Sequence, residues 1–320
     1  MLSLSKWFAS PAKLRELGIM GINQRNSRYV MRYNKRQLYP LVDDKLKTKQ
    51  LAVANNLAVP ELYGVARTEK EVQTVEQLIQ GHSQFVIKPA QGSGGNGILV
   101  IDGRIGKNYR RSSGRVTSLG EIQHHCSNIL SGMYSLAGQP DAIMVEYMVQ
   151  FDPLFQHISY QGVPDIRVIV FRGIPVASMV RLPTRESDGK ANLHQGAIGV
   201  GININSGTTM IGVHHNHTIT EHPDTGHSAV GMTIPNWDDI LKLSIQCADT
   251  VKLGYLGVDL VIDSQKGPLM LELNARPGLN VQLANRQGLL KKLEALEAYQ
   301  QLPTNVDERA ALAKKLSIII

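Results

Sequence analysis

The last third of the chain carries two segments that together restrict its fold more than any other feature. Residues 257–260 read Gly-Val-Asp-Leu, and residues 271–278 read Leu-Glu-Leu-Asn-Ala-Arg-Pro-Gly. Side chains two residues apart on a strand share a face, so neighbouring strands would gather Asp259, Glu272 and Asn274. Mg²⁺ prefers hard oxygen ligands of this kind, usually together with phosphates and water. The two segments therefore predict a sheet with a magnesium site, although Asp259 taken alone would fit a solvated sheet face.

A glycine-rich loop lies between two β-like runs in residues 85–98, which read Phe-Val-Ile-Lys-Pro-Ala-Gln-Gly-Ser-Gly-Gly-Asn-Gly-Ile. Its four glycines and one serine allow backbone N–H groups to wrap around an anion, and Lys88 adds a positive charge beside them. The loop lacks the Gly-Lys-Ser/Thr of a Walker loop, and no helix follows directly, as a dinucleotide fingerprint requires. We predict a phosphate clamp, with a plain hairpin loop as the alternative.

Composition and charge are typical of a globular protein with anionic partners. A chain of 320 residues, 42% of them hydrophobic, is long enough for two or three packed subdomains. Its 34 Lys and Arg residues exceed its 27 Asp and Glu residues, which gives a net charge of +7. Nucleotide phosphates, carboxylates and nucleic acid are all compatible with this surplus. Cys126 and Cys247 lack metal-ligand spacing, so we expect neither a disulfide framework nor a zinc site.

Residues 2–9 have neither the apolar length nor the cleavage site of a signal peptide. No apolar run in the sequence approaches the roughly 18 to 20 residues that are needed to cross a bilayer. We therefore expect a cytoplasmic protein without a transmembrane segment.

The hydrophobic periodicity predicts a mixed α+β fold, with a small lid-like α/β unit and a larger antiparallel sheet. A helix over residues 43–57, capped by Asp43 or Asp44, begins the small unit. The unit continues with a strand at 61–66, a helix at 69–80 and a strand at 84–88. The rest of the chain is expected to form strands at 142–149, 166–171, 176–181, 197–201, 208–213, 256–262 and 268–274, a helix from Asn236 to Lys252, and helices at the C-terminus.

Two further groups of residues resemble binding sites, but their spacing does not support that interpretation. Five histidines match no zinc motif, so we expect solvated or substrate-facing side chains. They are His214, His215, His217, His222 and His227. A positive stripe near the N-terminus would suit nucleic acid or an acidic peptide, but a solvated arm packed by its tyrosines is favoured. The stripe consists of Arg25, Arg28, Arg32, Lys35 and Arg36, with Tyr29, Tyr33 and Tyr39 between them.

Several motifs together make the chain resemble an ATP-grasp ligase of the alpha-L-glutamate ligase-like branch, akin to the enzyme that adds glutamate to a ribosomal protein. They span roughly residues 43–280 and are Asp44-Lys45, the Lys88-Pro89 glycine-rich loop, Asp165-Ile166-Arg167-Val168, Gly257-Val258-Asp259 and Leu271 to Gly278. The resemblance implies an ATP-grasp fold in which a small α/β lid subdomain packs on a larger antiparallel-sheet subdomain. It implies domains at 1–42 (a shortened N-terminal arm or short helical region), 43–149 (the lid and adenine linker), 150–285 (the core with the Mg/ATP and substrate site) and 286–320 (C-terminal helices).

The resemblance also implies ATP and one or two Mg²⁺ ions as cofactors, with Mn²⁺ as the alternative ion. The two lysines would contact the ATP phosphates, the loop would close over them, and adenine would lie along residues 146–149. The implied cofactor-binding residues are Lys45, Lys88, Gly92, Ser93, Gly94, Gly95, Gly97, Glu146, Tyr147, Met148, Val149 and Asn192, and the implied metal ligands are Asp259, Glu272 and Asn274.

The implied reaction joins a carboxylate to an amine through an acyl-phosphate and releases ADP and phosphate. Arg276, Arg181 and Arg167 would bind the substrate carboxylate and stabilise the acyl-phosphate, since bidentate guanidinium groups suit both. Arg167 has less weight, because an Asp-x-Arg pair such as Asp165 and Arg167 is often a structural salt bridge. Glutamate or another amino acid is one expected reactant. The partners are small-molecule acids and amines, with a peptide or protein acceptor and a homo-oligomer left open and no nucleic acid expected.

Two departures from the family pattern are visible in the sequence. Only 44 residues precede Lys45, where family members usually have a whole N-terminal domain, so substrate recognition would be reorganised. No acidic residue has a clear position for the ribose hydroxyls, because Asp152 is the only candidate after the linker. The alternative function is a catalytically silent ATP-binding regulatory or partner-binding protein. The complete set of expected ligands argues against such a loss of turnover.

Overall fold

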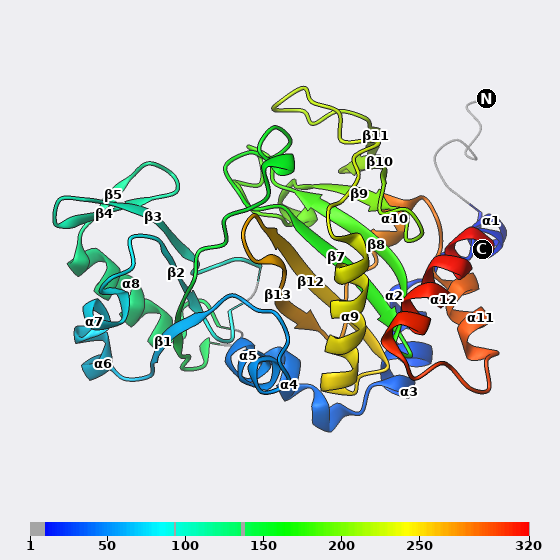
Figure 1. Ribbon diagram of the computed structural model, residues 1–320, viewed down its shortest axis with the longest axis horizontal. Helices are drawn as coiled ribbons and strands as arrows, with labels where there is room; N and C mark the ends of the chain where they lie inside the picture. The colour runs from blue at the N-terminus through cyan, green and yellow to red at the C-terminus, as the bar shows by residue number, and fades with distance from the viewer. Residues whose placement is uncertain (1–9, 93, 136–137, 320) are drawn as a thin grey trace.

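The computed structural model describes residues 10–92, 94–135 and 138–319, and these residues form two antiparallel sheets. A six-stranded sheet with its helices lies at one end of the molecule, and a seven-stranded sheet lies at its centre (Figure 1). Helices pack on both sheets. The predicted α+β class is therefore confirmed.

The small sheet has the strand order β1-β6-β2-β3-β4-β5. Helix α8 packs on β2 and β6, and α7 packs on β1. A capping box starts α8, because the Ser118 side chain accepts from the Glu121 N–H while Glu121 accepts from the Ser118 N–H. The elements are β1 (Leu62–Ala66), α6 (Glu69–Gln73), α7 (Val75–Ile79), β2 (Phe85–Pro89), β3 (Leu99–Ile105), β4 (Asn108–Arg111), β5 (Val116–Thr117), α8 (Leu119–Leu130) and β6 (Ile143–Glu146).

The large sheet has the strand order β11-β10-β9-β8-β7-β12-β13. Strands β7 and β8 form the hairpin expected from the sequence, and its turn residues Arg172 and Gly173 both have positive φ, as such tight turns require. Helix α9 packs on β7, β8, β12 and β13. The elements are η5 (Pro153–Phe155), β7 (Asp165–Phe171), β8 (Ile174–Leu182), η6 (Leu193–Gln195), β9 (Ile198–Ile202), β10 (Thr209–His214), β11 (His217–Ile219), α9 (Trp237–Val251), β12 (Tyr255–Asp263) and β13 (Gly267–Asn274).

The N-terminal segment packs tightly onto the large sheet. Tyr29 is fully buried, with its ring edge-on to Phe171 at 5.5 Å between centroids. The Asn34 side chain donates to the carbonyls of Tyr255 and Ala275 and accepts from the Tyr255 N–H. These contacts agree with an arm packed by its tyrosines. The elements are α1 (Pro11–Glu16), α2 (Ile22–Gln24), η2 (Arg25–Val30), α3 (Met31–Tyr33), η3 (Arg36–Leu38), α4 (Pro40–Asp43) and α5 (Lys45–Ala54).

Three arginines of the positive stripe bind other parts of the same chain. Arg28 forms ion pairs with Glu294 and Glu297 at 2.8 and 2.7 Å, and Arg32 lies 3.3 Å from Glu297. Arg25 donates to the Pro277 carbonyl at 2.8 Å. The arginines therefore hold the segment to α11 (Leu290–Glu297) and to the turn after β13.

Three helices follow the large sheet: α10 (Asn280–Asn285), α11 (Leu290–Glu297) and α12 (Val306–Ile319). Helix α10 packs on β8, β9 and β10, and α12 packs on α9 and β8. Cys126 in the small unit and Cys247 in α9 are both free and fully buried. Among the described residues, no helix has the length and apolar character to span a membrane.

Candidate nucleotide site between the two sheets

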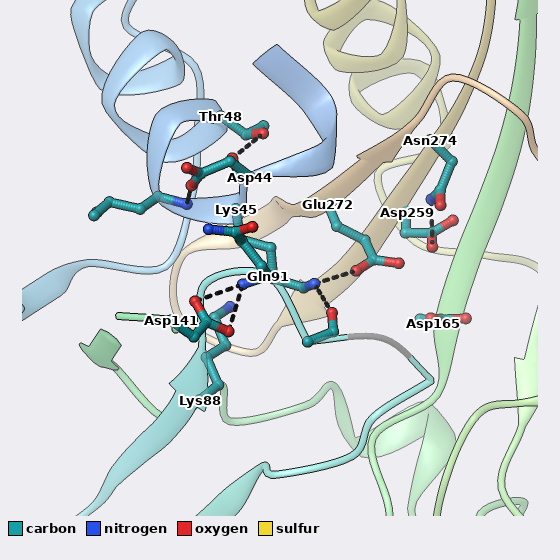
Figure 2. A network of polar contacts seen from close by, with 12 residues as sticks. Asp44, Lys45, Thr48, Lys88, Gln91, Asp141, Asp165, Asp259, Glu272 and Asn274 are labelled. Carbon is teal, nitrogen blue, oxygen red and sulfur yellow. Dashed lines mark hydrogen bonds and ion pairs between the residues drawn. The ribbon is translucent and has the colours of Figure 1, made fainter. Parts of the chain in front are cut away.

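Lys45 connects the glycine-rich loop to strand β13. Asp44 caps α5 by accepting hydrogen bonds from two N–H groups of the first turn, so that Lys45 is the first helical residue. The Lys45 N–H donates to the Ala90 carbonyl at 2.9 Å, and its ammonium group donates to the Gly92 carbonyl at 2.5 Å. The same ammonium group lies 3.6 Å from Glu272 (Figure 2). Two regions predicted separately from the sequence thus meet at one lysine.

The glycine-rich loop has a left-handed backbone conformation that residues other than glycine rarely adopt. Gly94, Gly95 and Gly97 have φ of 64°, 77° and 77°. A Cβ atom on Gly97 would lie 2.6 Å from the Tyr134 ring, and one on Gly94 would lie 3.8 Å from the Asn192 amide nitrogen. The loop therefore approaches the segment before β9 that carries Asn192. Ser93 lies outside the described residues.

A buried group of three side chains, which we call the lysine network, links α5 to the small sheet. Lys88 and Lys49 both form ion pairs with Glu146, the latter at 2.5 Å, and Lys49 also donates to the Pro60 carbonyl. All three side chains are at least nine-tenths buried. Burial lowers the pKa of Lys49 to about 8, and the charge of Lys88 adds to this effect. The network carries more positive than negative charge, and Lys88 lies on β2, the strand that leads into the glycine-rich loop.

The segment expected to receive adenine follows β6 and crosses towards the large sheet. The Tyr147 N–H donates to the Glu61 carbonyl at 2.8 Å, and its hydroxyl donates to Asp263 at 3.0 Å. The Met148 carbonyl accepts from the Gln150 side chain at 3.0 Å. Burial, with the Asp263 hydrogen bond, raises the pKa of Tyr147 to about 12. These contacts fix the linker, and the adenine role of Glu146, Tyr147, Met148 and Val149 stays a prediction.

The three predicted metal ligands do gather, where the middle of β12 pairs with the end of β13. Asp259 and Glu272 are direct cross-strand partners, and Asn274 donates to Asp259 at 3.2 Å. Figure 2 shows Glu272 directed towards Lys45, with Asp259 and Asn274 beside it. Glu272 keeps about a third of its side chain exposed, whereas Asp259 is 1% exposed. The two carboxylates therefore differ sharply in their access to a ligand.

Asp259 belongs to a second buried group, the arginine network of Asp165, Arg167, Arg181 and Asp259. Arg167 donates to both Asp259 oxygens at 2.7 and 2.5 Å, and Arg181 binds Asp165 and also reaches Asp259 at 2.9 Å. Burial opposes the ionisation of Asp259, but the two guanidinium charges outweigh it and lower its pKa. Burial raises the pKa of Asp165 to about 6 against the pull of Arg181, and the Asp259 charge adds to the rise.

The third predicted substrate arginine, Arg276, has different surroundings. Its guanidinium group lies over the Tyr39 ring at 5.1 Å and 3.9 Å from Asp43, and about half of its side chain is exposed. Arg167 and Arg181 are instead 12 to 13% exposed and already bind carboxylates. The structure thus brings two of the three arginines together, and the substrate role of all three stays a prediction.

The family model described as sugar-transfer associated ATP-grasp matches residues 24–298. The chain belongs to this ATP-grasp family. The matched range includes both sheets, the glycine-rich loop and both charge networks.

Several curated proteins are similar to this ATP-grasp chain over most of its length. A probable alpha-L-glutamate ligase of Parasynechococcus marenigrum is 23% identical over 74% of this chain and 36% of its own. A ribosomal protein bS6–L-glutamate ligase of Escherichia coli is 22% identical over 74% of this chain and 56% of its own. The chain thus spans about a third to two thirds of the length of the curated relatives it matches. In the solved structure of the ATP-grasp ligase PsnB with a minimal precursor, the match covers 83% of this chain and 63% of that one, at 14% identity and a TM-score of 0.45.

The described ATP-grasp residues fit ATP with a divalent cation in two respects. Lys45 and the positive-φ glycines offer a cation and backbone N–H groups to a polyphosphate, and the lysine network leaves a positive charge behind them. Glu272 offers an accessible carboxylate beside the Asn274 amide, which are ligand types that Mg²⁺ accepts. Asp259 would join them only if its oxygens exchanged an arginine for the ion.

Sequence reasoning missed two residues that shape this ATP-grasp site. Lys49 lies four residues after Lys45, a spacing that places both on one helix face, so this signal was present in the sequence. Asp141 accepts the Gln91 N–H with both oxygens at 3.0 Å and so holds the start of the glycine-rich loop (Figure 2). No local signal identifies Asp141, because its contact joins residues 50 positions apart.

Proposed function

We propose that the protein is an ATP- and Mg²⁺-dependent carboxylate–amine ligase that forms an amide bond through an acyl-phosphate and releases ADP and phosphate. The observation that carries this proposal is the position of Lys45. Its ammonium group contacts the carbonyl of Gly92 in the glycine-rich loop and lies 3.6 Å from Glu272 on β13. A polyphosphate at the loop and a cation at the carboxylates would be neighbours at this point.

The proposed chemistry depends mainly on positioning and electrostatics, as phosphoryl transfer generally does. Lys45 and Lys88 would neutralise phosphate oxygens, and the glycine-rich loop would exclude water above them. When bound at Glu272 and Asn274, Mg²⁺ would neutralise charge on the β- and γ-phosphates. Arg167 on β7 and Arg181 on β8 belong to the same large sheet as Glu272. A substrate carboxylate would compete with Asp165 and Asp259 for their guanidinium groups. Asp263 holds the Tyr147 hydroxyl and keeps the linker next to the sheet.

The substrates we propose are a small carboxylic acid and an amine, with an amino acid as one of them. The names of the curated relatives support glutamate as a candidate, and two of those relatives act on the ribosomal protein bS6. The family description, sugar-transfer associated, supports adding amino sugars and sugar acids to the candidates. A peptide or protein acceptor remains part of the proposal.

A catalytically silent ATP-binding protein is the second candidate, and one observation favours it. Both oxygens of Asp259 already accept hydrogen bonds from arginines, so this carboxylate is not free for a metal ion. A protein that binds ATP at the loop without transferring its phosphate would leave the arginine network in this state. Turnover requires at least Glu272 to hold the cation.

The deciding experiment measures ADP release from ATP and Mg²⁺ with pools of amino acids, amino sugars, sugar acids and short peptides, with product analysis by mass. The Glu272→Gln variant is compared with Glu76→Gln, which changes an exposed glutamate on α7. We expect substrate-dependent ADP and a condensed product, both lost in Glu272→Gln and kept in Glu76→Gln. Release of AMP would refute the acyl-phosphate, and ATP binding without turnover across all pools would favour the silent protein.

A further inference from the structure

A compact group of potential metal ligands lies away from the nucleotide site. Glu186, His214 and His215 each present one ligand atom, and the three atoms all lie within 4.8 Å of one another. The Glu186 carboxylate oxygen is 2.9 Å from His215 Nε2 and 3.5 Å from His214 Nε2. The two imidazole rings lie side by side, with 4.3 Å between their centroids. None of these residues belongs to the glycine-rich loop or to either charge network.

The backbone explains how two adjacent histidines face the same carboxylate. His214 ends β10 and pairs with His217 across the hairpin, so that His215 is a turn residue. Its φ of 52° lies in the left-handed region, which breaks the strand alternation that would point the two rings to opposite faces. The turn therefore brings both imidazole groups to one side of the hairpin.

The carboxylate arrives from a separate segment, between β8 and β9. Glu186 fits against Gly196, where a Cβ atom would lie 2.7 Å from its carboxyl carbon. The Gly196 carbonyl oxygen is itself 3.0 Å from His214 Nε2, so a fourth potential ligand atom, an oxygen, lies next to the three side chains. The segment 186–196 therefore contacts the site through its first residue, Glu186, and its last, Gly196. Just before this segment, the Pro183 carbonyl is 2.9 Å from His222 Nε2.

We propose that Glu186, His214 and His215 form a binding site for a late first-row divalent cation, with Zn²⁺ as its ordinary occupant. Zn–N and Zn–O bonds of about 2.0–2.2 Å place the ligand atoms of a tetrahedral site about 3.3 Å apart. The distances of 2.9 and 3.5 Å from the Glu186 oxygen to the two nitrogens lie on either side of that value. Imidazole nitrogen favours Zn²⁺, Ni²⁺ or Cu²⁺ over Mg²⁺, so this site differs in chemistry from the proposed magnesium site.

The spacing of the histidines in the sequence conceals this site. His214 and His215 are adjacent and match no zinc motif, and their third ligand comes 28 residues earlier, as counted from Glu186 to His214. Bound Zn²⁺ would connect the β10–β11 hairpin to the segment 186–196, which also carries Asn192 beside the glycine-rich loop. The ion would therefore order the side of the nucleotide site that faces the loop.

The test measures Zn²⁺ binding to tag-free, chelator-treated full-length protein in the presence of excess Mg²⁺. Binding is measured by calorimetry and by competition with a chromophoric chelator. Ligand variants are Glu186→Gln and His215→Ala, both at exposed positions. His217→Ala, on the same hairpin, is the matched control. We expect a single equivalent of Zn²⁺, an affinity at least about 10-fold weaker in each ligand variant, and an unchanged affinity in His217→Ala.

Co²⁺ substitution gives a second readout that does not depend on affinity. A site with histidine and carboxylate ligands should produce a visible absorption band that Glu186→Gln and His215→Ala abolish and His217→Ala keeps. The proposal is overturned if wild-type protein binds no stoichiometric Zn²⁺, or if the two ligand variants bind it as tightly as wild type. Equal weakening by His217→Ala would likewise refute it, because the binding would then reflect histidine content and not this site.

Discussion

The small and large sheets each bury a group of ionised side chains, and the two groups differ in charge and in chemistry. The lysine network places two ammonium groups on one carboxylate, Glu146. The arginine network places two guanidinium groups on two carboxylates, Asp165 and Asp259. The first therefore has a surplus positive charge, and the second is balanced.

This difference indicates two different tasks. The surplus positive charge of the lysine network would favour an anion bound nearby, as the proposed polyphosphate site requires. In the arginine network the charges balance, and the guanidinium groups are always charged. Their ion pairs with Asp165 and Asp259 should therefore persist until another carboxylate competes for them. Lysines can also release a proton when buried, whereas arginines cannot, so removing an acid should cost the two networks different amounts of stability.

The largest expected effect follows from Asp259→Asn. The change leaves Arg167 and Arg181 with only Asp165 as a buried counter-charge, and neither guanidinium can deprotonate. We expect the free energy of unfolding to fall by about 3–5 kcal/mol, as for other broken buried pairs. Chemical denaturation followed by circular dichroism measures this. A loss below about 1 kcal/mol would show that Asp165 alone neutralises both arginines.

Glu146→Gln should have a smaller effect on the free energy of unfolding. It leaves Lys49 and Lys88 buried without their acid, but Lys49 can become neutral because its pKa is already lowered to about 8. We expect a loss of about 2–3 kcal/mol at pH 7 and a smaller loss at pH 9. Denaturation curves at both pH values test the prediction. An equal loss at the two pH values would contradict it.

The wild-type protein should gain stability as the pH rises above 8. Burial gives Lys49 a folded-state pKa of about 8, against 10.5 for the ordinary group in the unfolded chain. Between these values the unfolded chain binds more protons, so the free energy of unfolding rises with pH, by up to about 1.4 kcal/mol per pH unit. Lys49→Met should remove this slope between pH 8 and 9.5. An unchanged slope in the variant would assign it to another group.

The smallest effect is expected for Asp102→Asn, which breaks an exposed pair. Arg110 binds Asp102 at 2.7 Å, but half of the Arg110 side chain is in solvent. Exposed pairs contribute about 0–1 kcal/mol, so the free energy of unfolding should change within that range. The same denaturation assay serves as a control for the two buried networks. A loss as large as that of Glu146→Gln would mean that burial does not separate these pairs.

Local signals predicted much of the fold correctly. Asp44 caps α5 as expected, and the strands that carry Asp259 and Glu272 pair as their polar alternation indicated. The helix expected at 69–80 is divided into α6 and α7 at Thr74. Helix α8 was missed although Ser118 and Glu121 have capping-box spacing, which is a signal that the sequence contains.

The pairing of the buried charges could not be predicted in the same way. The sequence suggested that Arg167 pairs with Asp165, but these side chains are about 6.7 Å apart along one strand. Cross-strand partners are closer, at about 4.5–5.5 Å, so Asp165 pairs with Arg181 and Arg167 with Asp259. Such partners depend on strand order and register, which a single sequence does not specify. The contact of Glu186 with His214 and His215 was missed for the same reason.

The two buried thiols make this chain convenient for fluorescence spectroscopy. Cys126 and Cys247 are fully buried, and burial raises the pKa of both to about 12, so neither offers an accessible thiolate to a maleimide dye. Natural cysteines therefore need not be removed before dyes are attached elsewhere. A dye pair at Val116→Cys on the small sheet and Gln246→Cys on α9, both exposed positions, would report the separation of the two sheets as nucleotide is added.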